Sequence, residues 1–118
     1  MAKSRVSERA TLDAPFKEMV RRILATGNPQ KIILFGSRAR GDARPDSDYD
    51  LLLIELSDQP RYRRAARYRR ALVGLAPAKD ILVWTPEEVA EWREVPNAFI
   101  TAALSEGVVL YERVLNEQ

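Results

Sequence analysis

Apolar residues along the chain form either short continuous runs or groups spaced three and four residues apart. The runs predict four strands, at residues 31–35, 50–55, 79–84 and 108–112. The spaced groups predict four helices, at residues 13–26, 61–75, 86–93 and 96–106. A capping box formed by Thr85 and Glu88 marks the start of the third helix. The alternation favours an α/β or α+β fold, in which helices flank a small mixed sheet.

The helical spacing also predicts which side chains face the core. In the first helix these are Phe16, Met19, Val20, Ile23 and Leu24. In the second we expect inward-facing Tyr62, Ala65, Ala66, Leu72 and Val73, and in the last Ile100, Ala103 and Leu104. Residues 1–12 carry no such pattern. We therefore expect a flexible or loosely docked N-terminus, followed by a single domain over residues 13–118.

Two aspartates introduce the second predicted strand. Successive side chains on a strand point to opposite faces, so Asp48 and Asp50 should share a face about 7 Å apart along the chain, while Tyr49 packs on the other side. Two carboxylates at the mouth of an apolar strand are costly unless a cation joins them. Asp46-Ser47-Asp48 alone is also compatible with an ordinary turn.

The residue types that are missing narrow the chemistry. The chain has no cysteine and no histidine, which removes disulfides, thiolate nucleophiles, imidazole bases and the usual zinc ligands. Oxygen-only ligands point to magnesium or manganese, and a two-ion site needs a further carboxylate. Asp80 is the best candidate, since it also begins an apolar strand; it would be a metal ligand and a proton acceptor. The alternative for Asp80 is an exposed edge residue.

Gly36 and Ser37, at the end of the first predicted strand, supply a phosphate-binding turn. Glycine allows a close approach of the backbone, and a helical turn from Ser37 would direct its N–H groups at a phosphate. Arg38 and Arg40 could add charge-assisted bonds, although their alternation lets only one face inward. The P-loop interpretation fails because Asp42 stands where that motif needs lysine.

Basic charge is concentrated in one segment. The net charge is +2, yet six arginines fall within residues 61–70 without an acid among them, so the rest of the chain carries 13 basic and 17 acidic residues. A solvated helix face is the simpler explanation, and an acidic partner or RNA is the alternative. No apolar run is long enough to span a bilayer, so we expect a soluble cytoplasmic protein with no membrane association.

The pattern of Gly36-Ser37, ten further residues, Asp48-x-Asp50 and a later Asp80 resembles the nucleotidyltransferases of the DNA polymerase β type. The short chain and its ending Glu106 to Tyr111 further resemble the minimal nucleotidyltransferase (MNT) domains paired with HEPN toxins in prokaryotes. The resemblance implies that Gly36 and Ser37 hold a nucleoside triphosphate. It also implies that Asp48 and Asp50 bind two magnesium ions, and that Asp80 completes the triad.

The resemblance implies a function as well. A magnesium-dependent enzyme would transfer a nucleoside monophosphate, from ATP, to a tyrosine hydroxyl of a cognate HEPN toxin and thereby act as an antitoxin. The alternatives are a non-catalytic module that neutralises its partner by contact, and nucleotidyl transfer to a small molecule. A homo- or hetero-oligomer is compatible with each, and nucleic-acid binding through the arginine-rich helix is a further alternative.

Overall fold

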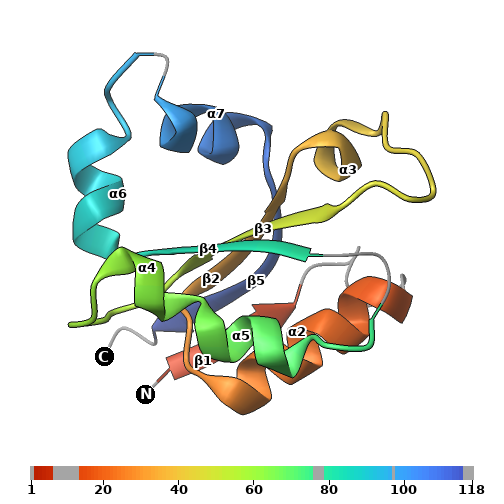
Figure 1. Ribbon diagram of the computed structural model, residues 1–118. Coiled ribbons are helices and arrows are strands. Elements are labelled where there is room, and N and C mark those ends of the chain that lie inside the picture. The colour runs from red at the N-terminus through yellow and green to blue at the C-terminus, as the bar shows by residue number, and fades with distance from the viewer. Residues whose placement is uncertain (1, 7–13, 76–78, 97, 116–118) are drawn as a thin grey trace.

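The computed structural model describes residues 2–6, 14–75, 79–96 and 98–115 of the 118-residue chain. Five strands form one mixed sheet (Figure 1): β1 (Ala2–Val6), β2 (Lys31–Phe35), β3 (Tyr49–Ile54), β4 (Lys79–Trp84) and β5 (Val108–Leu115). Their spatial order is β1-β5-β2-β3-β4. Strands β3 and β4 are parallel, and the other neighbours are antiparallel. The predicted fold class, a mixed sheet flanked by helices, is confirmed.

Helices cover both faces of this sheet (Figure 1). They are α2 (Ala14–Thr26), α3 (Ser37–Arg40), α4 (Arg61–Arg64), α5 (Ala66–Ala71), α6 (Pro86–Trp92) and α7 (Phe99–Glu106). Helices α2 and α5 pack beside each other on one face, and α6 and α7 lie on the other. None of the helices in the described part of the chain combines the length and the apolar character needed to cross a bilayer.

The alternation of side chains along the strands divides the core into two clusters. The cluster beneath α2 and α5 contains the strand residues Ile32, Leu34, Leu51, Leu53, Ile81 and Val83. The cluster beneath α6 and α7 contains Ile33, Leu52, Ile54 and Trp84. Asp50 alternates with Leu52, and Asp80 lies two residues from Leu82, so both aspartates belong to the face that α6 and α7 cover only in part.

Most of the predicted helix faces are confirmed. Of the five residues predicted to face inward on α2, four are buried and Leu24 packs against the same cluster. The capping box is present, because the Thr85 side chain accepts from the Glu88 N–H and the Glu88 carboxylate accepts from the Thr85 N–H. Ile100 and Ala103 of α7 are buried. The proposed opening of α7 at Pro96-Asn97 falls partly on Asn97, which lies outside the described residues.

The prediction of one continuous helix over residues 61–75 is wrong. The segment forms two short helices separated at Ala65, and Tyr62 and Val73, predicted to face inward, are 76% and 71% exposed. The buried aromatic residue is Tyr68, whose hydroxyl donates to the carboxylate of Glu55. A large ring with a polar tip can be buried when that tip has a partner. Tyr68 is therefore the tyrosine that is buried, because Glu55 accepts a hydrogen bond from its hydroxyl, whereas Tyr62 stays exposed.

The N-terminal segment contains a strand that the apolar pattern did not predict. Residues 2–6 pair antiparallel with β5, from Ala2 opposite Leu115 to Val6 opposite Tyr111. The last strand correspondingly extends beyond its predicted end at residue 112. Backbone pairing with a strand that is distant in sequence leaves no local pattern to detect. The flexibility expected of residues 1–12 stays a prediction.

Candidate active site

A tight turn follows β2. Gly36 has φ 76°, a backbone conformation that side chains with a Cβ rarely adopt, and its carbonyl accepts from the N–H groups of Ala39 and Arg40, each at 3.0 Å. Helix α3 begins at Ser37 and ends at Arg40, and the C-cap residue Gly41 adopts the left-handed conformation. The predicted helical turn at Ser37 is therefore present.

The carboxylate of Asp50 lies directly against this turn. Asp50 is opposite Phe35 in the antiparallel pair of β2 and β3, one residue from Gly36. A Cβ placed on Gly36 would come within 2.2 Å of Asp50 Oδ2. The missing side chain of Gly36 therefore makes room for this carboxylate, which adds a second requirement for glycine to the positive φ.

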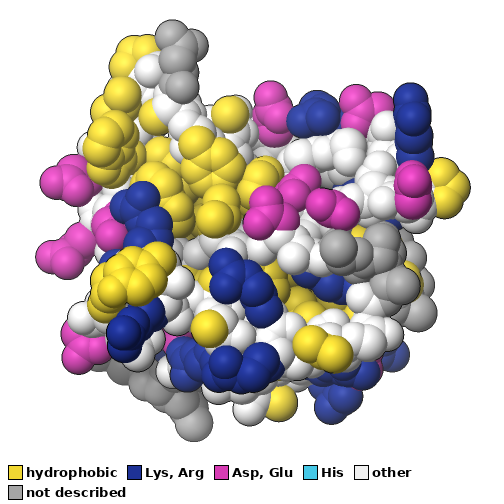
Figure 2. Space-filling model, viewed as in Figure 1, with side chains coloured by type: hydrophobic (Ala, Val, Ile, Leu, Met, Phe, Trp, Pro, Cys, Tyr) yellow, Lys and Arg dark blue, Asp and Glu magenta, His cyan; other side chains and the backbone are white. Residues whose placement is uncertain are grey.

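The register between β3 and β4 brings two of the predicted site residues together. Asp50 and Asp80 are Cα partners in the parallel pair. Burial raises the pKa of Asp50 above its ordinary value, and the charges of Asp80 and Asp48 raise it further, while Arg40 opposes them. Asp48 directly precedes β3 and is exposed, whereas Tyr49 is buried on the opposite side, as its alternation predicts. Figure 2 shows acidic side chains gathered at the centre of this view, beside hydrophobic ones.

The donor chemistry of this group fits a hard divalent cation. The pKa of Asp50 is raised by its acidic neighbours, so a cation beside it would stabilise its ionised form, and oxygen donors suit magnesium. As they stand, however, no three acidic, histidine or cysteine side chains within the described residues form a group that could hold an ion. The metal roles of Asp48, Asp50 and Asp80 accordingly stay predictions.

The two arginines of α3 have different surroundings. Arg40 forms ion pairs with Asp42 at 3.5 Å and with Glu106 of α7 at 3.8 Å. Its positive charge also acts to lower the pKa of Asp50. Arg40 is half-exposed, so these pairs leave it accessible to an anion. Nothing in the sequence alone distinguishes Arg38 from Arg40 as the inward-facing residue. The structure directs Arg40 to the carboxylates.

Arg38 instead holds the loop that leads to Asp48. Its Nη2 donates to the carbonyls of Arg44, Pro45 and Ser47 at 3.3, 3.1 and 2.9 Å, and its Nε donates to Ser47 O at 3.2 Å. The guanidinium also lies over the ring of Tyr49, 4.1 Å from its centroid. Arg38 thus fixes the residues on both sides of Asp48. Sequence reasoning missed this contact because the accepting carbonyls belong to the backbone.

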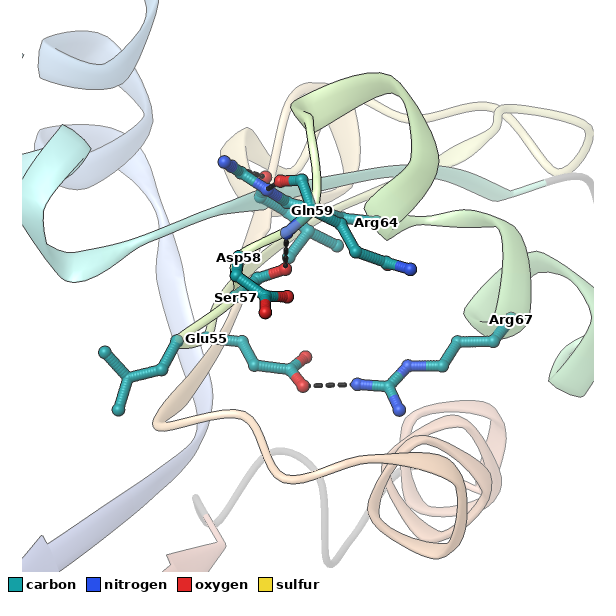
Figure 3. Close-up of a pocket in the computed structure, with 8 residues that line it drawn as sticks. Glu55, Ser57, Asp58, Gln59, Arg64 and Arg67 are labelled. Atoms are coloured by element: carbon teal, nitrogen blue, oxygen red, sulfur yellow. Dashed lines mark hydrogen bonds and ion pairs between the residues drawn. The ribbon is translucent and has the colours of Figure 1, made fainter.

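At the other end of β3, a cavity of about 330 Å³ opens between β3 and the arginine-rich helices (Figure 3). Glu55, buried just after β3, accepts from Arg67 and from the Tyr68 hydroxyl on opposite sides of its carboxylate. Burial, followed by the bond to Glu55, raises the pKa of Tyr68. Since Glu55 and Asp50 stand at opposite ends of the strand, this cavity is separate from the carboxylate group.

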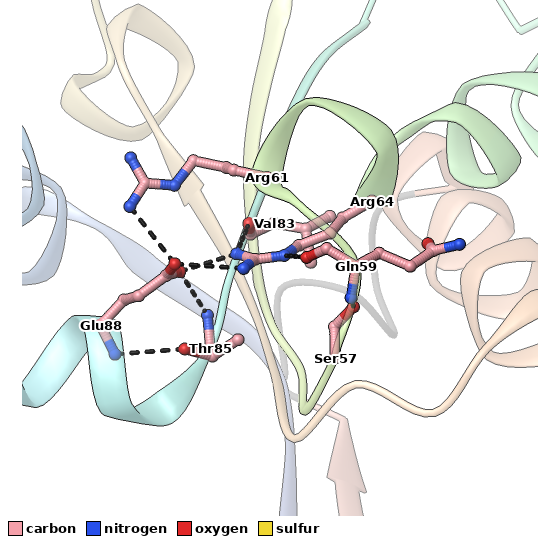
Figure 4. A network of polar contacts seen from close by, with 7 residues as sticks. All are labelled: Ser57, Gln59, Arg61, Arg64, Val83, Thr85 and Glu88. Atoms are coloured by element: carbon pink, nitrogen blue, oxygen red, sulfur yellow. Dashed lines mark hydrogen bonds and ion pairs between the residues drawn. The ribbon is translucent and has the colours of Figure 1, made fainter.

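A second acid holds another pair of these arginines (Figure 4). Arg64 donates from both terminal nitrogens to Glu88, at 2.7 and 3.1 Å, and also to the carbonyls of Gln59 and Val83. Arg61 approaches the same carboxylate at 3.4 Å. The hydrogen bond from Arg64 lowers the pKa of Glu88 to about 2. Arg61, Arg64 and Arg67 are therefore paired with acids of the fold itself.

The remaining arginines of the run are Arg63, Arg69 and Arg70, which are exposed. Arg63 lies 5.8 Å from the ring centroid of Tyr62. The prediction of a solvated basic face thus describes these three, whereas the other three are paired with Glu55, just after β3, and Glu88 of α6. The pairing was invisible in the sequence because Glu55 and Glu88 lie outside the segment.

The fold and the carboxylates at the start of two adjacent parallel strands define the class of protein. The family model described as polymerase beta, nucleotidyltransferase, matches residues 18–115. The chain belongs to this nucleotidyltransferase family. The search of curated proteins gave no match.

Two solved structures share the fold. One, described as a toxin-antitoxin with AMP-PNP, superposes with a TM-score of 0.61 at 16% identity, over 81% of this chain and 72% of that chain. The other, from Sulfolobus solfataricus and assigned provisionally as a nucleotidyltransferase, has a TM-score of 0.55 at 20% identity, over 87% of both chains. At these identities the likeness concerns the fold alone.

Proposed function

We propose that this protein is a magnesium-dependent nucleotidyltransferase that transfers AMP from ATP to a tyrosine hydroxyl of a HEPN-type toxin, and so acts as an antitoxin. One observation carries the catalytic part of the proposal. Asp50 lies against Gly36 on one side and is in register with Asp80 on the other. A phosphate-binding turn and two carboxylates are thereby adjacent.

In this proposal Asp48, Asp50 and Asp80 hold magnesium, two ions being expected, and manganese could replace it. Bound magnesium would neutralise the charge that develops on the phosphate oxygens during transfer. The raised pKa of Asp50 supports the assignment, because the crowded carboxylates would gain from a cation between them.

The proposed reaction is a substitution at the α-phosphorus of ATP. The acceptor hydroxyl oxygen forms a bond to this phosphorus, the bond from the phosphorus to the oxygen bridging the β-phosphate breaks, and pyrophosphate leaves. The hydroxyl proton passes to the carboxylate of Asp80, because the chain has no histidine to receive it. Asp80 is exposed, so an acceptor can reach it from solvent.

The turn after β2 would bind the phosphates of ATP. The N–H groups following Gly36, the hydroxyl of Ser37 and the guanidinium of Arg40 are the proposed donors. Arg38, although also predicted as a phosphate ligand, is engaged with carbonyls of the loop, so we assign it to positioning.

The partner assignment is supported by the neighbour described as a toxin-antitoxin with AMP-PNP, which has the same fold. AMP-PNP is an analogue of ATP, which favours ATP as the donor. The proposal implies a complex between this chain and a toxin protein. Since ATP is a cytoplasmic nucleotide, the reaction is proposed to occur in the cytoplasm.

The decisive experiment measures transfer of label from α-labelled ATP, with magnesium, into the product of the adjacent reading frame. Wild-type protein is compared with the Asp48→Asn/Asp50→Asn double variant. We expect that the wild-type protein labels the partner on a tyrosine and that the double variant does not. Mass spectrometry of the labelled partner identifies the modified residue.

Other outcomes would replace the proposal. A stable complex without any label would favour neutralisation by contact alone. Label in a low-molecular-mass product would favour a small-molecule acceptor. Equal labelling by the double variant would overturn the carboxylate assignment.

A further inference from the structure

Three aromatic side chains form a continuous row beside the carboxylates. The rings of Phe35 and Phe99 meet edge to face with centroids 5.2 Å apart. The ring of Trp84 lies 6.0 Å from Phe99 at an interplanar angle of 44°. Arg61 ends the row, with its guanidinium 4.3 Å from the centroid of Trp84. We call these three rings the aromatic row.

The aromatic row begins at the candidate active site. Phe35 is the Cα partner of Asp50 and directly precedes Gly36. Trp84 is on the strand that carries Asp80, four residues further along and on the same face. In Figure 2, hydrophobic side chains near α7 accordingly lie next to the acidic side chains at the centre of the view.

Phe99 leaves part of the row open to solvent. Its side chain is 40% exposed, whereas Trp84 is buried and Phe35 is partly buried. Phe99 is therefore the ring of the aromatic row that a ligand can reach from solvent. Trp92 and Val95 are exposed as well, but Phe99 is the exposed residue whose ring contacts Phe35, the neighbour of Gly36 in the proposed phosphate-binding turn.

We propose that the exposed face of Phe99 is the seat of the nucleobase of the nucleoside triphosphate. The inference rests on the proposed function, because the phosphates must occupy the turn at Ser37 for the base to reach the row. Bases stack on aromatic side chains through their π-faces, whatever their identity. Among these three residues only the Trp84 indole can donate a hydrogen bond, and it is buried. The base should therefore be bound by stacking without hydrogen-bond readout, with little distinction between ATP and GTP.

The test compares ATP with inorganic tripolyphosphate, which has the phosphates but no base. Calorimetric titrations with magnesium present measure the affinity of each for wild-type protein and for Phe99→Ala. We expect Phe99→Ala to bind ATP about 5- to 30-fold more weakly, with unchanged affinity for tripolyphosphate. Phe99→Tyr, which retains a ring, should bind ATP as wild-type protein does. Tyr62→Ala removes an exposed aromatic residue outside the row and should change neither affinity.

Each other result would overturn the proposal. If Phe99→Ala binds ATP as tightly as wild-type protein does, the base does not bind at the aromatic row. The proposed function would be unaffected by that result. If Phe99→Ala lowers the affinities for ATP and tripolyphosphate equally, Phe99 acts through the packing of the site and does not contact the base. Loss of partner binding with unchanged ATP binding would make Phe99 a protein contact. If wild-type protein binds neither ligand, the proposed function fails together with this inference.

Discussion

Asp50 on β3 and Asp80 on β4 are direct partners across two parallel strands. After burial, the charge of Asp80 is the largest influence that raises the pKa of Asp50, and Asp48 adds to it. Parallel pairing brings the starting ends of both strands to one edge of the sheet, so residues 30 positions apart in sequence share one electrostatic environment. Ionised Asp50 is therefore a cost to the folded protein until a cation joins it.

Asp50→Asn should lower the rate of nucleotidyl transfer more than about 100-fold, since a carboxylate metal ligand supplies charge stabilisation worth several kcal/mol. The fold should persist, because the amide removes the repulsion with Asp80 and Asp48. We expect a melting temperature equal to that of the wild type or up to about 4 °C higher. The direction of this change in melting temperature follows from the raised pKa of Asp50. In the wild type, ionisation of Asp50 lowers stability as the pH rises through that pKa. Asparagine does not ionise, so the variant does not lose this stability.

Asp46→Asn is the matched control for this prediction, because Asp46 is an exposed aspartate of the same loop. It should leave transfer and melting temperature unchanged. Full transfer by Asp50→Asn, or a similar loss by Asp46→Asn, would contradict the assignment of the site to Asp50.

Magnesium should stabilise the wild-type protein against heat. A ligand that binds only the folded state adds about 2.7 kcal/mol at 100 times its dissociation constant. We expect the melting temperature to rise with added magnesium and to fall again with a chelator. The Asp48→Asn/Asp50→Asn variant should show neither change in the same scans. An equal rise in both proteins would indicate a site elsewhere.

Gly36→Ala and Gly41→Ala form a matched pair. Both glycines have positive φ, 76° and 89°, so each alanine should cost about 1–2 kcal/mol of stability through backbone strain. Only at Gly36 would the new Cβ meet Asp50 Oδ2, whereas nothing lies within 4 Å at Gly41. Denaturant unfolding measures the shared cost, and the transfer assay should show loss of activity for Gly36→Ala alone. Equal activity losses would attribute the effect to strain.

Arg38→Gln should lower kcat about 10- to 100-fold, because misplacement of a reacting group by about 1 Å has an effect of this size. The KM for ATP should change little, since Arg38 donates to loop carbonyls. Arg38→Lys should not restore kcat, because a lysine lacks the planar fork that reaches several acceptors at once.

Steady-state kinetics with Arg44→Gln as control check this prediction. The Arg44 side chain is exposed, so its removal should leave kcat and KM unchanged. A raised KM for ATP with unchanged kcat in Arg38→Gln, together with rescue by Arg38→Lys, would instead make Arg38 a phosphate ligand.

Glu88→Gln should destabilise the protein by about 2 kcal/mol at pH 7, because it removes a charge-assisted pair and leaves the Arg64 guanidinium, whose side chain is only 9% exposed, without its anion. The lowered pKa of Glu88 makes this contribution complete above the ordinary value of 4.5 and lost as the pH falls toward about 2. Urea unfolding at several pH values should show the difference between wild type and variant shrinking below pH 4.5.

Glu87→Gln, one residue away and exposed, is the control and should alter stability by less than about 0.5 kcal/mol. A constant difference between wild type and Glu88→Gln down to pH 2 would show that Glu88 contributes through packing, without its charge.

The sequence by itself determined the features that depend on neighbouring residues. Periodicity located α2 and four of the five strands, and the capping box at Thr85 fixed the start of α6. The same local pattern singled out Gly36, Asp50 and Asp80, because a glycine turn and aspartates at strand starts are recognisable within a few residues. Spacing and residue type carry this information without any knowledge of the fold.

Only the tertiary structure decided which distant residues meet. The register of β3 and β4 placed Asp80 beside Asp50, and the pairing of β1 with β5 added a strand without a local signal. The acids that pair with three of the six arginines lie outside the arginine-rich segment. Tyr68 is buried because its hydroxyl donates a hydrogen bond to Glu55. Such partners are chosen by burial, which penalises an unpaired polar group, and burial is a property of the assembled fold.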